Sequence, residues 1–370
     1  MENTCNELLQ ICLRGEDWPP ALLDRALAVD DGRALLSIVV ERLGDLFEPG
    51  LCDVYQRLFT QVIERVAPDL RPRLRRPQPC EPPKSVDRVY VLSRVTLGAD
   101  VAVTSVMLDA MKRRYPEARV IFVGPRKSYE MFQADPRIGH LEAPYARNGS
   151  LAERLRASAR LWFDEGIVID PDSRLTQLGL ISVCDESRYF WFQSRSLSGG
   201  RLPDIAAAWA KSIFSVDARP YVAPLPTTGD SADITVSLGV GENESKRLGD
   251  EFERDLLKLL AGKSVLIDKG GTAEERSRVE RALQPGMRAH DGSFASFAVE
   301  IARSKLYIGY DSSGGHVASA CGIPLICIFA GAVSNRFMER WKPAGTVLQA
   351  GPGEGREILR KIQTVMSATR

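Results

Sequence analysis

A run of small and polar residues between a predicted strand and a predicted helix is the clearest candidate ligand site in this sequence. It follows the strand over 305–309 and precedes the helix over 317–321. Glycine and serine let the backbone approach a ligand, and a helix N-terminus offers free amides and partial positive charge to a phosphate. The same pattern also suits a plain turn with a hydroxyl N-cap, and a lone histidine is often structural. The candidate residues for binding a phosphate are Asp311, Ser312, Ser313, Gly314, Gly315 and His316.

A second candidate is the loop over 95–100, which again joins a predicted strand to a predicted helix. An aspartate at its end, Asp100, could act as a general base at the mouth of a cleft. Aspartate is also a good helix N-cap, so the spacing alone leaves both roles open.

A third candidate is the loop over 239–247, which follows the first strand of the second half of the chain. It begins at Gly239 and ends with two basic residues, Lys246 and Arg247, which would suit a diphosphate. Solvated lysines are common on loops, and that is the competing interpretation. The pair Gly270-Gly271 predicts another strand-to-helix turn of low specificity.

Composition limits the classes of protein to which this chain can belong. Its 370 residues are enough for two or three domains, and 44% apolar with 26% charged residues is a globular composition. With 49 Lys and Arg against 48 Asp and Glu, the net charge of +1 does not suggest a nucleic-acid binder. Seven cysteines without a CxxC pair or a Cys/His cluster predict neither a disulfide framework nor a zinc site. The sequence shows no signal-peptide pattern and no apolar run long enough for a membrane helix. It therefore predicts a soluble cytoplasmic protein.

The chain divides into a helical part and an α/β part. Residues 1–66 carry apolar residues at three-to-four spacing and predict a helical module. Residues 67–87 hold six prolines and four arginines, which predicts a solvated linker, and we expect the module to form a separate unit.

Beyond the linker, short apolar runs alternate with helical patterns. Strands are predicted over 88–93, 119–123, 166–170 and 189–192, and after a proline-rich break at 219–228 over 233–237, 264–267, 305–309 and 324–329. This alternation predicts two doubly wound parallel sheets, in domains at 88–222 and 229–350, followed by a C-terminal helix within 351–370. Ligands of such sheets bind beyond the carboxyl ends of the strands, here in a cleft between the two domains.

Two segments together resemble glycosyltransferase family 9, which includes the ADP-heptose–lipopolysaccharide heptosyltransferases. Residues 92–120, with Arg94, Gly98-Ala-Asp100 and the run Arg114-Tyr-Pro, are similar to the family's opening pattern. Residues 301–324, from Ile301-Ala through Asp311-Ser and His316 to Gly322-Ile-Pro, resemble its second signature. The likeness covers about 88–345, and 1–87 match nothing in it.

This resemblance implies a GT-B architecture of two Rossmann-like domains and metal-independent, inverting transfer without a cofactor. It implies that Asp100 is the base, that Lys246 contacts the donor diphosphate, and that residues 311–316 hold the phosphates and sugar. The donor would be an ADP-heptose-like nucleotide sugar. The loop from Gly239 to Lys246-Arg247 resembles a further pattern of the family. Departures from the family's patterns, such as Leu248 in place of the tryptophan that follows Lys-Arg, indicate a divergent branch.

The acceptor stays open at this point: a glycan, a lipid-linked saccharide at the inner membrane face, or a small molecule. The arginine-rich linker leaves peripheral membrane association open. An alternative from another class is an inactive GT-B scaffold that binds a protein partner through residues 1–66. An epimerase or a nucleotide-sugar hydrolase on the same fold is a third reading.

Overall fold

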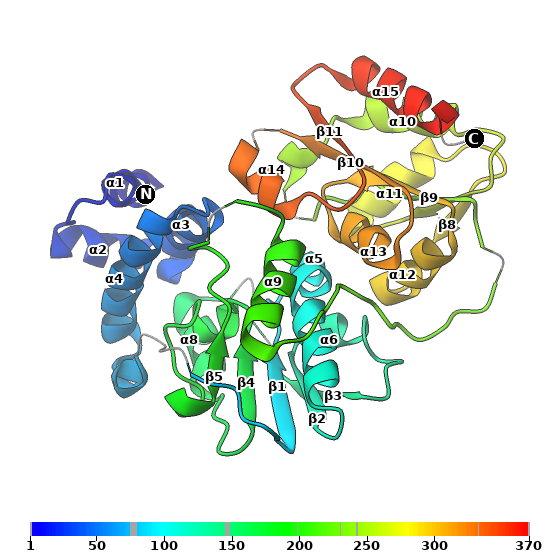
Figure 1. The fold of residues 1–370 in the computed structure, drawn as a ribbon. Coiled ribbons are helices and arrows are strands. Elements are labelled where there is room, and N and C mark those ends of the chain that lie inside the picture. The colour runs from blue at the N-terminus through cyan, green and yellow to red at the C-terminus, as the bar shows by residue number, and fades with distance from the viewer. Residues whose placement is uncertain are drawn as a thin grey trace. The chain divides into compact units, whose positions relative to one another are not determined.

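The computed structural model describes residues 2–74, 80–143, 145, 149–197, 199–229, 231–241, 243–331 and 333–368. The chain forms two compact units, which are described separately (Figure 1). The first unit comprises Met1–Thr96, Val106–Tyr129 and Arg137–Arg219. The second comprises Leu97–Ser105, Glu130–Pro136 and Pro220–Arg370.

The first unit begins with the helical module that the apolar spacing predicts. Its main helices are α1 (Glu2–Leu13), α2 (Pro20–Leu27), α3 (Glu41–Asp45) and α4 (Pro49–Val66), with helical turns η1 (Val29–Gly32) and η2 (Leu35–Val40) between α2 and α3. Proline occupies the first position of α2 and of α4, where its missing amide hydrogen costs nothing.

The first sheet is entirely parallel, in the order β3-β2-β1-β4-β5. Its strands are β1 (Arg88–Leu92), β2 (Arg119–Gly124), β3 (Ile138–Glu142), β4 (Ile167–Asp170) and β5 (Tyr189–Trp191). Its helices include α6 (Ser105–Arg114), α7 (Arg126–Tyr129), α8 (Leu151–Ala159) and α9 (Leu202–Phe214). Four strands match the predicted runs, whereas β3 was not predicted because Gly139 and His140 interrupt its short apolar pattern.

The helical module and the first sheet domain share one hydrophobic core, so the expectation of separate units is wrong. Leu151 and Leu155 of α8, with Leu178 and Ile181 of the loop after β4, pack among the buried residues of the module. Apolar spacing shows that each helix has a buried face but not what covers it.

Part of the predicted linker is also packed. Residues Pro68–Arg73 form a helical turn, η3, and Leu74 pairs with Ile181. The guanidinium of Arg73 donates hydrogen bonds to the carbonyls of Ala159, Leu161 and Ser182 at 2.6–2.8 Å. The solvated linker is therefore a wrong interpretation for residues 68–74, and Arg75 and Arg76 lie outside the described residues.

The second unit holds a six-stranded parallel sheet in the order β11-β10-β9-β6-β7-β8. Its strands are β6 (Ile234–Ser237), β7 (Val265–Asp268), β8 (Arg288–His290), β9 (Leu306–Tyr310), β10 (Leu325–Ala330) and β11 (Thr346–Ala350). Strands β8 and β11 were not predicted, since neither forms a continuous apolar run.

The helices of this unit are α10 (Asp250–Leu259), α11 (Ala273–Ala282), α12 (Phe294–Arg303), α13 (Ser313–Cys321), α14 (Asn335–Trp341) and α15 (Gly355–Ala368). Figure 1 shows the predicted C-terminal helix, α15, beside α10, and the two share the apolar core of the unit. The short helix α5 (Leu97–Ala99) and the turn η4 (Asp100–Thr104) also belong to this unit.

Both sheets have the doubly wound topology that the strand-and-helix alternation predicts. In each, the chain starts at a central strand, builds outward to one edge, and then returns to the other side of that strand. The order therefore reverses between β1 and β4 in the first sheet and between β6 and β9 in the second. Such a switch point is where open α/β sheets bind ligands.

We expect Arg73→Ala to lower the free energy of unfolding by at least about 2 kcal/mol, because even one hydrogen bond of a charged group contributes about 1.5–3 kcal/mol and this guanidinium makes three. Urea denaturation of the full chain would measure this. Arg71→Ala is the matched control: its exposed side chain forms, in the part of the chain that the structure describes, a loose ion pair with Glu64, so we expect a change within about 0.5 kcal/mol. Equal effects of the two substitutions would contradict a structural role of Arg73.

Candidate functional site

The second sheet brings two predicted site residues together at its switch point. Strands β6 and β9 are neighbours, with Ser237 opposite Gly309, so the loops that follow them begin side by side. The loop after β6 carries Lys246, whose Nζ donates to Oδ2 of Asp311 at 2.6 Å. Asp311 is only 7% exposed, and the side chain of Lys246 is 22% exposed. A basic group is therefore held at the position where this fold binds its ligand.

Arg247 anchors the loop that presents Lys246. Its guanidinium forms ion pairs with Glu244, Asp250 and Glu253 at 3.1, 2.5 and 2.7 Å. These partners raise the pKa of Arg247, chiefly through the hydrogen bond to Glu253. Its predicted contact with a donor stays a prediction, because in this arrangement the guanidinium faces carboxylates of its own loop and of α10.

The N-terminus of α13 directly follows Asp311. Ser312 is the N-cap residue, in extended conformation, and its side chain makes no capping hydrogen bond. The first amides of α13 are thus not satisfied by a cap and can bind an anion. Gly314 is required here for a structural reason, since a Cβ would collide with the ring and hydroxyl of Tyr307. Gly315 has more space, with its nearest neighbour at 3.5 Å from a Cβ.

His316 lies buried in the first turns of α13. Its ring contacts Trp341 edge-on, with centroids 5.8 Å apart. Burial lowers the pKa of His316 to about 4; the nearby Asp311 opposes this shift and Lys246 adds to it. The imidazole is therefore neutral at pH 7 and can offer a ligand a hydrogen bond but no charge.

The segment that carries Asp100 packs against α13 within the second unit. A Cβ at Gly98 would lie 3.1 Å from Cδ2 of His316 and 3.4 Å from Oγ of Ser313. Asp100 itself is fully buried at the start of η4, and its Oδ1 accepts a hydrogen bond from Thr104 at 2.7 Å. The geometry thus joins two predicted segments that are more than 200 residues apart.

Gly239, the first residue of the predicted diphosphate loop, lies next to the carboxylate of Glu275. A Cβ there would lie 3.1 Å from Oε1 of Glu275, a buried residue in the first turn of α11. Oε2 of Glu275 accepts hydrogen bonds from the amides of Gly271 and Thr272, in a capping box. The spacing from Thr272 to Glu275 is the signal that could have identified this box in the sequence. A role for Gly239 in donor binding stays a prediction.

Two aromatic residues of α14 complete the surroundings of Lys246. The ammonium of Lys246 lies 5.7 Å from the ring centroid of Phe337, which in turn contacts Trp341. Both rings are half-buried. No local pattern indicated these residues, because their importance depends on the packing of α14 against a loop about 90 residues earlier.

The first sheet's switch point is closed by its own residues. Oγ of Ser173, after β4, donates to the carbonyl of Ser93, after β1. Arg94 donates from its buried guanidinium to the carbonyl of Pro171 and to Oγ of Ser194. These bonds use the polar groups that a ligand would otherwise meet.

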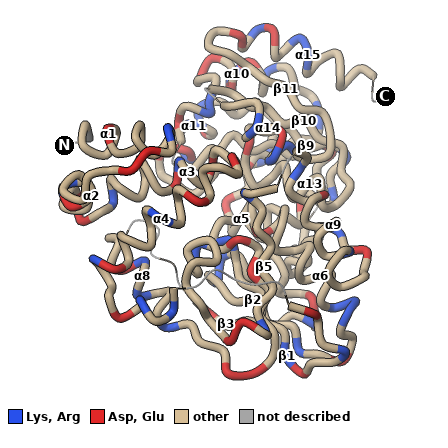
Figure 2. Tube along the Cα trace, turned by 60° about the vertical axis from the view of Figure 1, so that its left-hand side comes forward, with Lys and Arg blue, Asp and Glu red and all other residues tan. Residues whose placement is uncertain are grey.

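Charge is mixed over the described chain. Basic and acidic residues are interspersed along the trace (Figure 2), in line with the net charge of +1. In the ranges that the structure describes, no group of three or more His, Cys, Asp or Glu is arranged to hold a metal ion. Nor does any described helix have the length and apolarity needed to cross a membrane.

Solved structures with the same fold exist, although the sequence matches no family model and no curated protein. The E. coli heptosyltransferase WaaC with ADP aligns with 76% of this chain and 100% of its own, at 16% identity and a TM-score of 0.58. The E. coli ADP-heptose LPS heptosyltransferase II covers 76% of this chain and 99% of its own, at 14% identity and a TM-score of 0.54. A glycosyltransferase family 9 protein from Veillonella parvula covers 76% and 90%, at 15% identity and a TM-score of 0.54.

The chain therefore has the α/β GT-B fold, with two Rossmann-like sheets. Within that class its fold is that of the family 9 heptosyltransferases, as the two resembling segments predict.

The buried His316 makes stability depend on pH. In the unfolded chain its pKa is 6.5, whereas the folded protein lowers it to about 4. The unfolded state thus binds more protons between these values, so the contribution is complete above pH 6.5 and is lost as the pH falls toward 4. The full loss is about 3 kcal/mol, since a tenfold change in proton affinity corresponds to about 1.4 kcal/mol.

We expect His316→Gln to remove this loss. Urea denaturation from pH 7 to pH 4 measures the unfolding free energy of both proteins. The wild type should lose more of it than the variant as the pH falls, so the advantage of the wild type over the variant should shrink. A difference that stays constant over this range would show that His316 is not buried in its neutral form.

Proposed function

We propose that this protein is a glycosyltransferase that moves a sugar from a nucleoside diphosphate to a hydroxyl acceptor. The observation that carries the proposal is Lys246, held by Asp311 at the switch point beside the uncapped N-terminus of α13. A leaving diphosphate needs positive charge and amide donors, and both occur together here.

In the proposed reaction the acceptor oxygen attacks the anomeric carbon while the bond from that carbon to the diphosphate oxygen breaks. The diphosphate leaves with the electron pair and is stabilised by Lys246 and the first amides of α13. The hydroxyl proton passes to Asp100 as general base. Attack opposite the leaving group inverts the anomeric centre. Because Lys246 and the helix supply the charge, the proposal needs neither a metal ion nor another cofactor.

An ADP-linked, heptose-like sugar is the donor we propose. Two segments resemble family 9, and the WaaC structures of the same fold are described with ADP and with ADP-2-deoxy-2-fluoro heptose. We place the reaction in the cytoplasm, with a glycan, a lipid-linked saccharide at the inner membrane face, or a small molecule as acceptor.

Lys246→Ala should weaken ADP binding by about 10- to 100-fold, because a hydrogen bond to a charged group contributes about 1.5–3 kcal/mol. Titration calorimetry with ADP, UDP, GDP and CDP, each with and without EDTA, measures the affinity and the preferred base. Lys305→Ala is the control: this exposed lysine precedes β9, at the amino ends of the strands, and among the described residues its ammonium pairs with Asp233. Unchanged ADP affinity in Lys246→Ala would remove Lys246 from the site.

Asp100→Asn should abolish sugar transfer while leaving ADP affinity within about twofold, since the base acts on the acceptor and not on the diphosphate. Transfer is followed as release of ADP from ADP-heptose in the presence of candidate acceptors. If Asp100→Asn keeps full transfer activity, Asp100 is not the base. If neither protein transfers sugar or binds a nucleotide, the scaffold reading is favoured.

A further inference from the structure

One aromatic side chain of the second unit, that of Phe337 on α14, lies beside the ammonium of Lys246. The distance from Nζ of Lys246 to the ring centroid is 5.7 Å. An ammonium within about 6 Å of a ring centroid is attracted by the negative charge on the face of the ring. The ammonium therefore has two neighbours of different chemistry, the carboxylate of Asp311 and an apolar ring.

A close approach of two loops places this ring. Gly331, directly after β10, has φ +81°, and a Cβ there would collide with the carbonyl oxygen of Ser245, the residue before Lys246. Glycine is required at such a contact because it has no Cβ and adopts positive φ without strain. Ser334 then caps α14 by accepting a hydrogen bond from the amide of Phe337 at 3.1 Å. The loop of Lys246 and the start of α14 are thus held against each other.

Trp341 supports the ring from the next turn of α14. Its indole contacts Phe337, with centroids 6.3 Å apart, and on α13 it contacts the buried His316 at 5.8 Å. The three rings connect α14 to the first turns of α13, whose N-terminus is the proposed phosphate site. A ring held in this way is already ordered before a ligand binds, which lowers the entropic cost of binding.

The ring changes what surrounds the charge of Lys246. An ammonium has three N–H donors, and in the described part of the chain Asp311 accepts from one of them, which leaves two for a ligand. The ring cannot form a strong hydrogen bond and keeps water away from one side of the ammonium. Charges attract more strongly where less water screens them, so the ring strengthens the pull of Lys246 on a phosphate.

We propose that Phe337 is a positioning residue for the donor diphosphate. Its ring holds the ammonium of Lys246 in place and shields it from water, so that the charge acts more strongly on the diphosphate. The inference rests on the proposed function, in which Lys246 contacts that diphosphate. It adds to the site a residue that acts through Lys246 and not by touching the reacting atoms.

A double-mutant cycle on the ligand-free protein tests the contact between ring and ammonium. Phe337→Leu removes the aromatic face and keeps an apolar side chain, and Lys246→Met removes the charge and keeps an unbranched stem. Urea denaturation at pH 7 measures the unfolding constant of each protein. We expect the double variant to be at least threefold more stable than the two single effects together predict. Threefold corresponds to about 0.7 kcal/mol, at about 1.4 kcal/mol per factor of ten.

Phe294→Leu is the matched control for this cycle. Phe294 is also half-buried and belongs to the same unit, but it lies on α12, where its ring contacts that of Phe297. We expect Phe294→Leu and Lys246→Met to add within about twofold, as substitutions without a shared contact do. Additive effects for Phe337→Leu as well would show that its ring does not hold the ammonium and would overturn the proposal.

ADP affinity, measured by titration calorimetry, tests whether the contact serves the diphosphate. We expect Phe337→Leu to weaken ADP binding by at least threefold, and Phe337→Tyr, which keeps the aromatic face, to stay within twofold of the wild type. In the Lys246→Met background Phe337→Leu should have no further effect, because the charge through which the ring acts is gone. A residue with a merely structural role would weaken binding equally in both backgrounds.

The outcomes for this inference and for the proposed function stay separate. ADP binding that Phe337→Leu leaves unchanged, or weakens equally with and without Lys246, overturns the inference alone. A loss of the same size in Phe337→Tyr also overturns it, because the aromatic face is then not what matters. Absence of ADP binding by the wild type overturns the proposed donor site and, with it, the part assigned to Phe337, whatever the ligand-free cycle shows.

Discussion

The ion pair between Lys246 and Asp311 is the contact on which the polar end of the second sheet depends. Each residue follows a strand of the central pair, so the pair forms only when β6 and β9 lie in register. Taking either charge out of water would be costly without its partner. Arg247 and its three carboxylates then fix the backbone beside Lys246, which leaves the ammonium next to the open N-terminus of α13.

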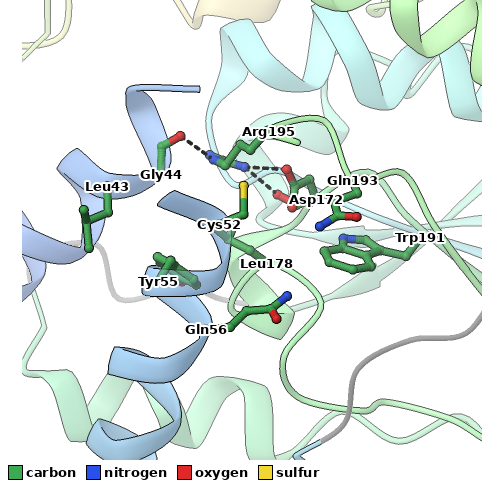
Figure 3. Close-up of a pocket in the computed structure, with 10 residues that line it drawn as sticks. All are labelled: Leu43, Gly44, Cys52, Tyr55, Gln56, Asp172, Leu178, Trp191, Gln193 and Arg195. Carbon is green, nitrogen blue, oxygen red and sulfur yellow. Dashed lines mark hydrogen bonds and ion pairs between the residues drawn. The ribbon is translucent and has the colours of Figure 1, made fainter. Parts of the chain in front are cut away.

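The two sheets have the same strand order but use their switch points differently. In the second sheet a basic residue and free amides are presented there, whereas in the first Ser173 and Arg94 close the gap with hydrogen bonds to the chain itself. One strand further along, beyond β4 and β5, polar residues of the first unit meet residues of the helical module (Figure 3). The helical module covers this position, and Arg195 joins the module to Asp172.

The helical module is an integral part of the first unit. Its core continues into α8 and into the loop after β4, and Arg73 ties the following turn to three carbonyl groups. Hydrophobic burial contributes about 25 cal/mol per Å² of apolar surface, so a shared core of this kind resists separation. The module therefore forms a fixed wall of the small pocket that is lined by Leu43, Cys52 and Trp191.

Local patterns in the chain are sufficient for much of this architecture. Apolar runs predicted eight of the eleven strands in the described ranges, three-to-four spacing predicted the helices of residues 1–66, and glycine and serine after 309 indicated the turn before α13. These features depend on neighbours within a few residues, where periodicity and turn chemistry act. Long-range packing decided the rest: the short strands β3, β8 and β11, the closure of Arg247 on its own loop, and the ring of Phe337 beside Lys246. Each of these depends on which distant segments meet, and no spacing along the chain carries that information.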